Sequence, residues 1–86
     1  MAACQAMTTT STDPLLTAFA KVLKRERQKA GLSQEELAHR AGKSMRYVSL
    51  LESRHHQPSL ATLKGLCDGM GIKMSDVVLA IEAELE

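Results

Sequence analysis

The sequence is poor in aromatic residues. They make up 2% of the 86 residues, as one Phe and one Tyr, so Leu, Ile, Val, Met and Ala must fill the core. A chain of this length builds one small domain. Aliphatic side chains suit closely packed helices, and no segment has the pattern of a strand, so we expect an all-α fold.

Long apolar runs and cysteine frameworks are also lacking. No run approaches the roughly 20 apolar residues of a membrane span. The N-terminus has no apolar stretch of a secretory signal, and its residues 1–12 predict a disordered tail. Cys4 and Cys67 show neither metal-ligand spacing nor a disulfide framework. We therefore expect a reduced, cytoplasmic protein that does not enter a membrane.

Signs of catalysis or metal binding are missing. The sequence has no nucleophile–base pair, no paired carboxylates and no glycine-rich phosphate loop, which argues against an enzyme and against a cofactor. His39, His55 and His56 raise the question of a metal ion. Adjacent histidines rarely share one ion, however, and no Cys or carboxylate stands at ligand spacing, so we expect no metal site.

Residues 33–53 predict two helices joined by a tight turn. Gly42 follows the first helix, where a left-handed backbone conformation favours glycine. The small residue Ala38, Gly42 four positions on and the β-branched Val48 six further on have the spacing of a helix-turn-helix. The second helix of such a unit lies in the major groove of DNA.

The remaining helices follow from caps and apolar periodicity, which together predict one domain over residues 13–86. We expect Leu15 and Leu60 on inward faces, and Gly69 with Gly71 to end the fourth helix. The five predicted helices span residues 14–30, 34–41, 45–53, 60–70 and about 75–85. Their predicted caps are Asp13, Ser33 (with Glu36 as a capping box), Ser44, Ser59 and Ser75.

Charge is unevenly distributed, although the net charge is only +1. Residues 21–64 hold ten Lys and Arg against four Glu, whereas residues 65–86 hold one Lys against five acidic residues. The basic half contains the helix-turn-helix, as attraction to phosphates requires. The alternative is that these basic side chains only keep the helices soluble.

Residues 23–78 resemble the Cro/repressor (Xre) family of helix-turn-helix proteins. The resemblance implies a compact five-helix, lambda-repressor-like domain that regulates transcription and binds double-stranded DNA as a homodimer. Two positions depart from the family: Arg54 stands where Gly is usual, and Lys43 where an apolar residue is usual. The residues that carry the resemblance are Arg27, Gly31-Leu32-Ser33-Gln34, Leu37-Ala38, Gly42, Val48-Ser49, Glu52 and Pro58-Ser59-Leu60.

The predicted DNA contacts centre on the second helix of the motif. Arg46 can hold both acceptors of a guanine, or it can contact a phosphate instead. Met45 and Leu50 can pack against thymine methyls, although Leu50 can also be partly buried. Gln34, at a helix N-terminus, matches a family residue that touches the DNA backbone; otherwise it is only exposed to solvent. The full predicted set is Gln34, Lys43, Ser44, Met45, Arg46, Tyr47, Ser49, Leu50, Arg54 and His55.

Two further sets are structural. The resemblance implies an ion pair between Arg27 and Glu52, which ties the first helix to the end of the third. We place a dimer interface on the last helix, because its apolar stripe is longer than a small core needs. The stripe consists of Val77, Val78, Ile81 and Leu85, and the alternative is that all four pack internally.

The sequence thus predicts a DNA-binding transcriptional regulator, in particular a repressor that binds a palindromic operator as a homodimer. An antitoxin or a restriction–modification controller protein of the same fold is the alternative. The tail lacks the apolar pattern of a toxin-binding segment, so a toxin partner is not favoured. A protein–protein adaptor is a third possibility, against which the basic Lys43 and Arg46 argue.

Overall fold

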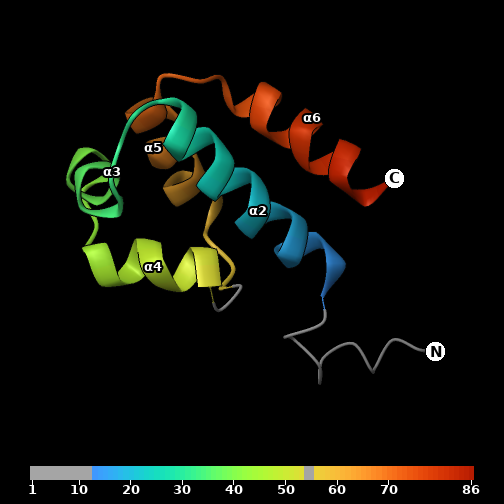
Figure 1. The fold of residues 1–86 in the computed structure, drawn as a ribbon, viewed down its shortest axis with the longest axis horizontal. Helices are drawn as coiled ribbons and strands as arrows, with labels where there is room; N and C mark the ends of the chain where they lie inside the picture. The colour runs from blue at the N-terminus through green and yellow to red at the C-terminus, as the bar shows by residue number, and fades with distance from the viewer. Residues whose placement is uncertain (1–12, 54–55) are drawn as a thin grey trace.

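The computed structural model describes residues 13–53 and 56–86, and the predicted tail with Cys4 lies outside these ranges. The described residues form five α-helices and no strand, which confirms the all-α fold (Figure 1). No helix among them is long and apolar enough to cross a membrane. The helices are α2 (Pro14–Lys29), α3 (Gln34–Ala41), α4 (Met45–Ser53), α5 (Leu60–Met70) and α6 (Met74–Leu85).

Side-chain caps fix most helix starts where the sequence predicts them. Asp13 accepts a hydrogen bond from the Leu15 N–H at 2.9 Å, and Pro14 occupies the first turn of α2, where it needs no N–H partner. Ser59 Oγ accepts from the Thr62 N–H at 3.0 Å at the start of α5. These bonds satisfy N–H groups that have no partner within the helix.

Two predicted helix boundaries were wrong, the start of α6 and the end of α5. Helix α6 begins at Met74 rather than after Ser75, and its N-cap residue Lys73 makes no side-chain cap bond. Gly69 does not end α5 but lies within it, close against α3. Only Gly71 ends the helix, in the left-handed conformation with φ of 71°.

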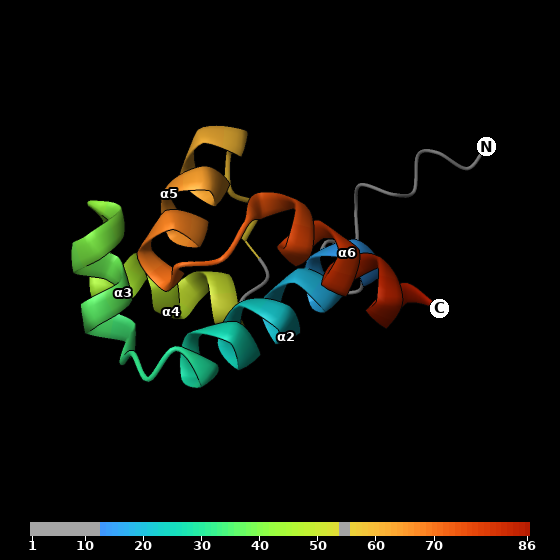
Figure 2. The same cartoon turned by 90° about the horizontal axis from the view of Figure 1, so that it is seen from above.

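The core lies where α2, α3, α4 and α5 meet, with α6 laid across α2 (Figure 2). Two predicted inward residues are exposed instead, Leu15 at 53% and Leu60 at 72%. Leu60 is the first residue of α5, and the helix turns its later positions Leu63, Leu66 and Cys67 inward. The buried core consists of Ala18, Phe19, Val22, Leu23, Leu32, Leu37, Ala38, Val48, Leu51, Leu66, Cys67, Val77 and Ile81.

Candidate nucleic-acid interface

Helix α4 has one buried and one exposed face. Val48 and Leu51 are completely buried in the core, so they fix the helix against the rest of the domain. Met45 is 52% exposed and Arg46 is exposed as well, both in the first turn of the helix. Ser49 and Leu50 are half-buried. The side chains available for base contacts are therefore concentrated toward the start of α4, the end that recognition helices present to bases.

The turn between α3 and α4 is closed by backbone and side-chain bonds. Gly42 adopts a left-handed conformation with φ of 71°, and the Lys43 N–H donates to the Ala38 carbonyl at 2.8 Å. Ser44 Oγ accepts from the Tyr47 N–H at 3.1 Å, which caps α4 as predicted. The turn thereby sets the angle at which α4 leaves α3.

Lys43 and Tyr47 form a pair beside this turn. The Lys43 ammonium lies 5.7 Å from the centroid of the Tyr47 ring, within the range of a cation–π interaction. Tyr47 is half-buried and packs against the core, whereas Lys43 is exposed. The exposed turn explains how the chain accommodates a lysine here, because its stem needs no apolar pocket.

The start of α3 carries a complete capping box. Glu36 N–H donates to Ser33 Oγ at 3.0 Å, and Ser33 N–H donates to Glu36 Oε1 at 2.8 Å. The hydrogen bonds from Ser33 lower the pKa of the Glu36 carboxyl below its ordinary value. The N–H groups of Gln34 and Glu35 remain without a partner inside the helix, so they can donate to an anion, while the acidic Glu35 and Glu36 stand in the same first turn.

Arg27 and Glu52 form a nearly buried ion pair that joins α2 to the last turn of α4. Arg27 Nε lies 2.7 Å from Glu52 Oε2, and the two side chains are only 10% and 4% exposed. Arg27 Nη2 donates to Glu52 Oε1 at 3.0 Å, while Nη1 donates to the Leu32 carbonyl at 2.8 Å. Hydrogen bonding to Glu52 raises the pKa of Arg27, so the guanidinium stays charged.

Gln34 belongs to the same network, a contact that sequence reasoning missed. Its Nε2 donates to Glu52 Oε1 at 3.0 Å. The half-buried Gln34 is thus not simply exposed to solvent. The two residues are 18 positions apart, and no local pattern relates them, so only the packing of α3 against α4 reveals the bond.

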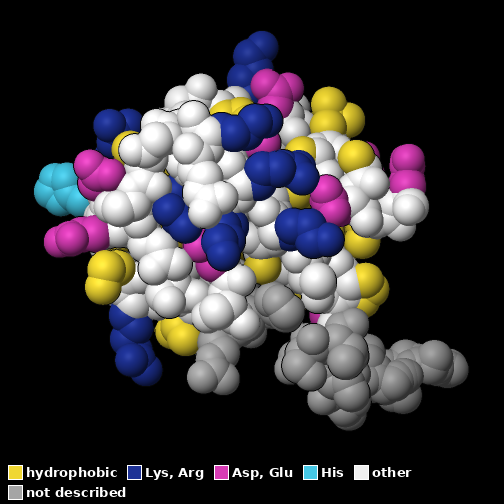
Figure 3. All heavy atoms as spheres, in the orientation of Figure 1, with side chains coloured by type: hydrophobic (Ala, Val, Ile, Leu, Met, Phe, Trp, Pro, Cys, Tyr) yellow, Lys and Arg dark blue, Asp and Glu magenta, His cyan; other side chains and the backbone are white. Residues whose placement is uncertain are grey.

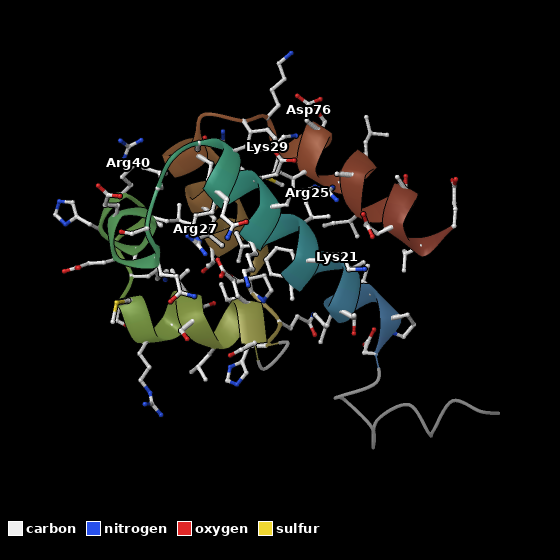
Figure 4. All side chains as sticks on the ribbon, viewed as in Figure 1. Lys21, Arg25, Arg27, Lys29, Arg40 and Asp76 are labelled. Carbon is white, nitrogen blue, oxygen red and sulfur yellow. The ribbon has the colours of Figure 1, made fainter. Side chains whose placement is uncertain are left out.

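The basic side chains of α2 are partly neutralised by α6. Lys and Arg gather over α2 in the space-filling view (Figure 3), and Lys21, Arg25 and Lys29 project from this helix (Figure 4). Arg25 Nη1 lies 2.8 Å from Glu84 Oε2, and Lys21 Nζ lies 3.4 Å from Glu84 Oε1. The acidic end of the chain therefore pairs with part of its basic half, which reduces the charge that α2 offers to phosphates.

The predicted interface stripe on α6 divides into two sets. Val77 and Ile81 are 1% and 7% exposed, because they fill the core of the chain itself, so their prediction as interface residues was wrong. Val78 and Leu85 are 42% and 46% exposed. Leu79, which the sequence analysis did not single out, is 63% exposed.

Arg54 and His55 lie outside the described residues. His56 is exposed, and the described part of the chain contains no group of three residues able to hold a metal ion. Cys67 is completely buried in the core, and this burial raises the pKa of its thiol.

Residues 23–77 match the family model described as helix-turn-helix. An uncharacterized HTH-type transcriptional regulator, y4dJ from Sinorhizobium fredii, is 37% identical over 54 residues, which cover 63% of this chain and 70% of that protein. The chain belongs to the Cro/repressor (Xre) helix-turn-helix family. As a member of this family, it is a DNA-binding transcriptional regulator.

Solved structures share the fold. The wild-type restriction–modification controller protein C.Esp1396I superposes with a TM-score of 0.76 at 23% identity, over 81% of this chain and 91% of that one. A variant of the same protein bound to its highest affinity operator site OM gives a TM-score of 0.80 at 20% identity, over 85% and 96% of the two chains. The clp gene regulator ClgR from Corynebacterium glutamicum gives 0.78 at 27% identity, over 83% and 76%.

Proposed function

We propose that this protein is a transcriptional repressor that binds a palindromic operator as a homodimer in the cytoplasm. Helix α4 enters the major groove, and the dimer brings two copies of α4 to half-sites about one helical turn, roughly 34 Å, apart. Bound at a promoter, the dimer prevents transcription by occupying the site.

The division of α4 into two faces is the observation that carries this proposal. The complete burial of Val48 and Leu51 holds the helix rigidly, while Met45 and Arg46 stand free at its start. Rigid elements position base-contacting side chains more accurately than loops do. The family assignment and this geometry therefore support the same role for α4.

Arg46 is the proposed base reader. A guanidinium can donate to guanine O6 and N7 together, which discriminates against another base by about 1–3 kcal/mol. Met45 has the apolar side chain that suits a thymine methyl group. The half-buried Ser49 and Leu50 are proposed to line the edge of the same surface, and the exposed Ser44 lies just before it.

Phosphate contacts are proposed on both sides of α4. Lys43 lies in the turn before α4, Tyr47 lies in its first turn, and Gln34 stands at the N-terminus of α3. Arg54 and His55 follow α4 in the sequence and complete the proposed set. Contacts of this kind position the protein on DNA but carry no direct sequence information.

The proposed dimer surface includes the exposed side of α6. Val78 and Leu85 are exposed, and Leu85 lines a groove together with residues of α2, among them Pro14 and Ala18. In Figure 1 the C-terminal end of α6 and the N-terminal end of α2 lie on the same side of the molecule, and α4 runs along another edge. A second copy docked on that side leaves α4 free for DNA. A single domain also offers less contact than specific binding usually requires.

Selection of bound sequences from a random pool of double-stranded DNA tests the proposal. We expect enrichment of an inverted repeat whose half-sites are about one helical turn apart. Enrichment of a single, asymmetric half-site would contradict the dimer. Binding at low salt without any enriched sequence would contradict sequence-specific repression and favour the antitoxin or adaptor functions.

A further inference from the structure

The buried carboxylate of Glu52 bonds to groups from two other helices. It accepts two N–H bonds from Arg27 of α2, at 2.7 and 3.0 Å, and one from Gln34 of α3, at 3.0 Å. Glu52 itself belongs to the last turn of α4. One side chain thus ties the start of α3 to the end of the helix proposed to read DNA.

The geometry leaves part of the Gln34 amide available. A glutamine amide has two N–H donors and one carbonyl acceptor. Only one N–H is needed for the bond to Glu52, and it is the one hydrogen bond of this side chain among the described residues. The second N–H remains for another acceptor. The backbone N–H groups of Gln34 and Glu35 at the same helix end attract a negative group to this place.

The charge of Glu52 is compensated beside it. Arg27 holds both carboxylate oxygens, and the side chain of Glu52 is 4% exposed. At Glu52 a phosphate near Gln34 therefore meets a paired carboxylate, and the other acidic side chains of this helix start are the exposed Glu35 and Glu36. The two bonds from Arg27 fix the Glu52 carboxylate in place, so that it can hold the Gln34 amide in one orientation.

We propose that Glu52 is a positioning residue for a contact between Gln34 and the DNA phosphate backbone. This inference rests on the DNA-binding mode proposed above. Glu52 touches no DNA; it fixes one N–H of Gln34 so that the other points outward before DNA arrives. Binding then loses less side-chain freedom than it would with a mobile glutamine.

A double-mutant comparison tests the inference with a random-sequence DNA duplex as the probe. Gln34→Met keeps the length of the side chain and removes the amide. We expect it to weaken binding by about tenfold or more, the loss of one hydrogen bond to a charged partner. Gln28→Met, at an exposed glutamine of α2, is the matched control and should leave affinity unchanged.

Gln34→Met is then made in a second background, in which Arg27→Met and Glu52→Leu replace the ion pair. Apolar replacement of both partners of a buried pair is often tolerated, and circular dichroism checks that the variant folds. In this background we expect Gln34→Met to weaken binding by less than about twofold, because the amide is no longer held. An equal loss in both backgrounds would overturn the role of Glu52.

Two other results separate this inference from the proposed function. If the native chain binds DNA and Gln34→Met changes nothing, the positioning role fails while DNA binding stands. If the native chain binds no DNA, the proposed function itself fails, and this inference with it.

Side-chain NMR relaxation of the native protein provides a second measurement that needs no variant. The Gln34 side-chain amide should be as rigid as the backbone in the free protein, whereas Gln28 and Gln57, both exposed, should be mobile. A Gln34 amide as mobile as these two controls would overturn the proposal.

Discussion

Gly69 of α5 lies directly against Leu37 of α3. A methyl group added to Gly69 would stand 3.1 Å from Leu37 Cδ1 and 3.1 Å from Arg40 Cβ. Leu37 is completely buried, and Arg40 Nη1 donates to the Gly69 carbonyl at 3.0 Å. Helix α3, the first helix of the helix-turn-helix, is therefore held against α5 by contacts with the backbone of α5 as well as with its side chains.

Gly69→Ala should destabilise the protein. Alanine favours the helix by about 0.5–1 kcal/mol, but forcing a methyl group into this contact costs about 1–3 kcal/mol. Gly65→Ala is the matched control in the same helix, because its methyl group would meet only the Ala41 carbonyl oxygen at 3.8 Å. We expect Gly65→Ala to raise the free energy of unfolding in urea. A rise for both variants would show that α3 and α5 are not tightly packed at Gly69.

The bond between Arg25 and Glu84 should make stability depend on pH. Hydrogen bonding to Arg25 lowers the pKa of Glu84 below its ordinary value of 4.5. The contribution of this pair to stability is therefore present above pH 4.5 and is lost as the pH falls through the lower pKa of the folded state. Glu84→Gln should lower the melting temperature at neutral pH, and the difference from the native protein should vanish in acid.

Glu82→Gln is the control for this prediction. Glu82 is on the same helix and exposed, and it makes no ion pair with another described residue. Its replacement should change the melting temperature little at either pH. An equal effect of the two substitutions would mean that the pairs of Glu84 with Arg25 and Lys21 do not contribute to stability.

Much of the fold follows from local patterns. The capping box at Ser33 and the left-handed Gly42 depend on neighbouring residues only, and both are found in the structure. Val48 and Leu51 lie in the core, as their spacing on α4 predicts. These signals suffice for the helix-turn-helix because its two helices are short and adjacent in the sequence.

Other features depend on packing between distant segments. Ser75 has the chemistry of a cap, yet α6 starts at Met74, with Ile72 and Met74 packed against the core. The stripe on α6 shows that one side of the helix is apolar, but it does not show how much of it α2 covers. The bond between Gln34 and Glu52 likewise requires the angle between α3 and α4.

Leu85→Lys should dissociate the proposed homodimer. A lysine on the flank of α6 that carries Val78 and Leu85 would place a charge in an apolar contact. Leu79→Lys is the matched control, since Leu79 is an exposed leucine of the same helix that lies about 120° around it from Leu85. Sedimentation equilibrium should show monomers for the first variant and dimers for the second. Dimers of Leu85→Lys and monomers of Leu79→Lys would instead place the interface on the flank of α6 that carries Leu79.

Binding by the Arg46→Ala variant tests the central claim, that α4 reads base sequence, most directly. Its affinity should be measured for the selected operator and for a random duplex, with Gln34→Ala as the comparison. We predict that Arg46→Ala lowers operator affinity more than random-sequence affinity, while Gln34→Ala lowers both by the same factor. An equal loss on both DNAs for Arg46→Ala would show that Arg46 contacts phosphate, and would contradict its role as the base reader.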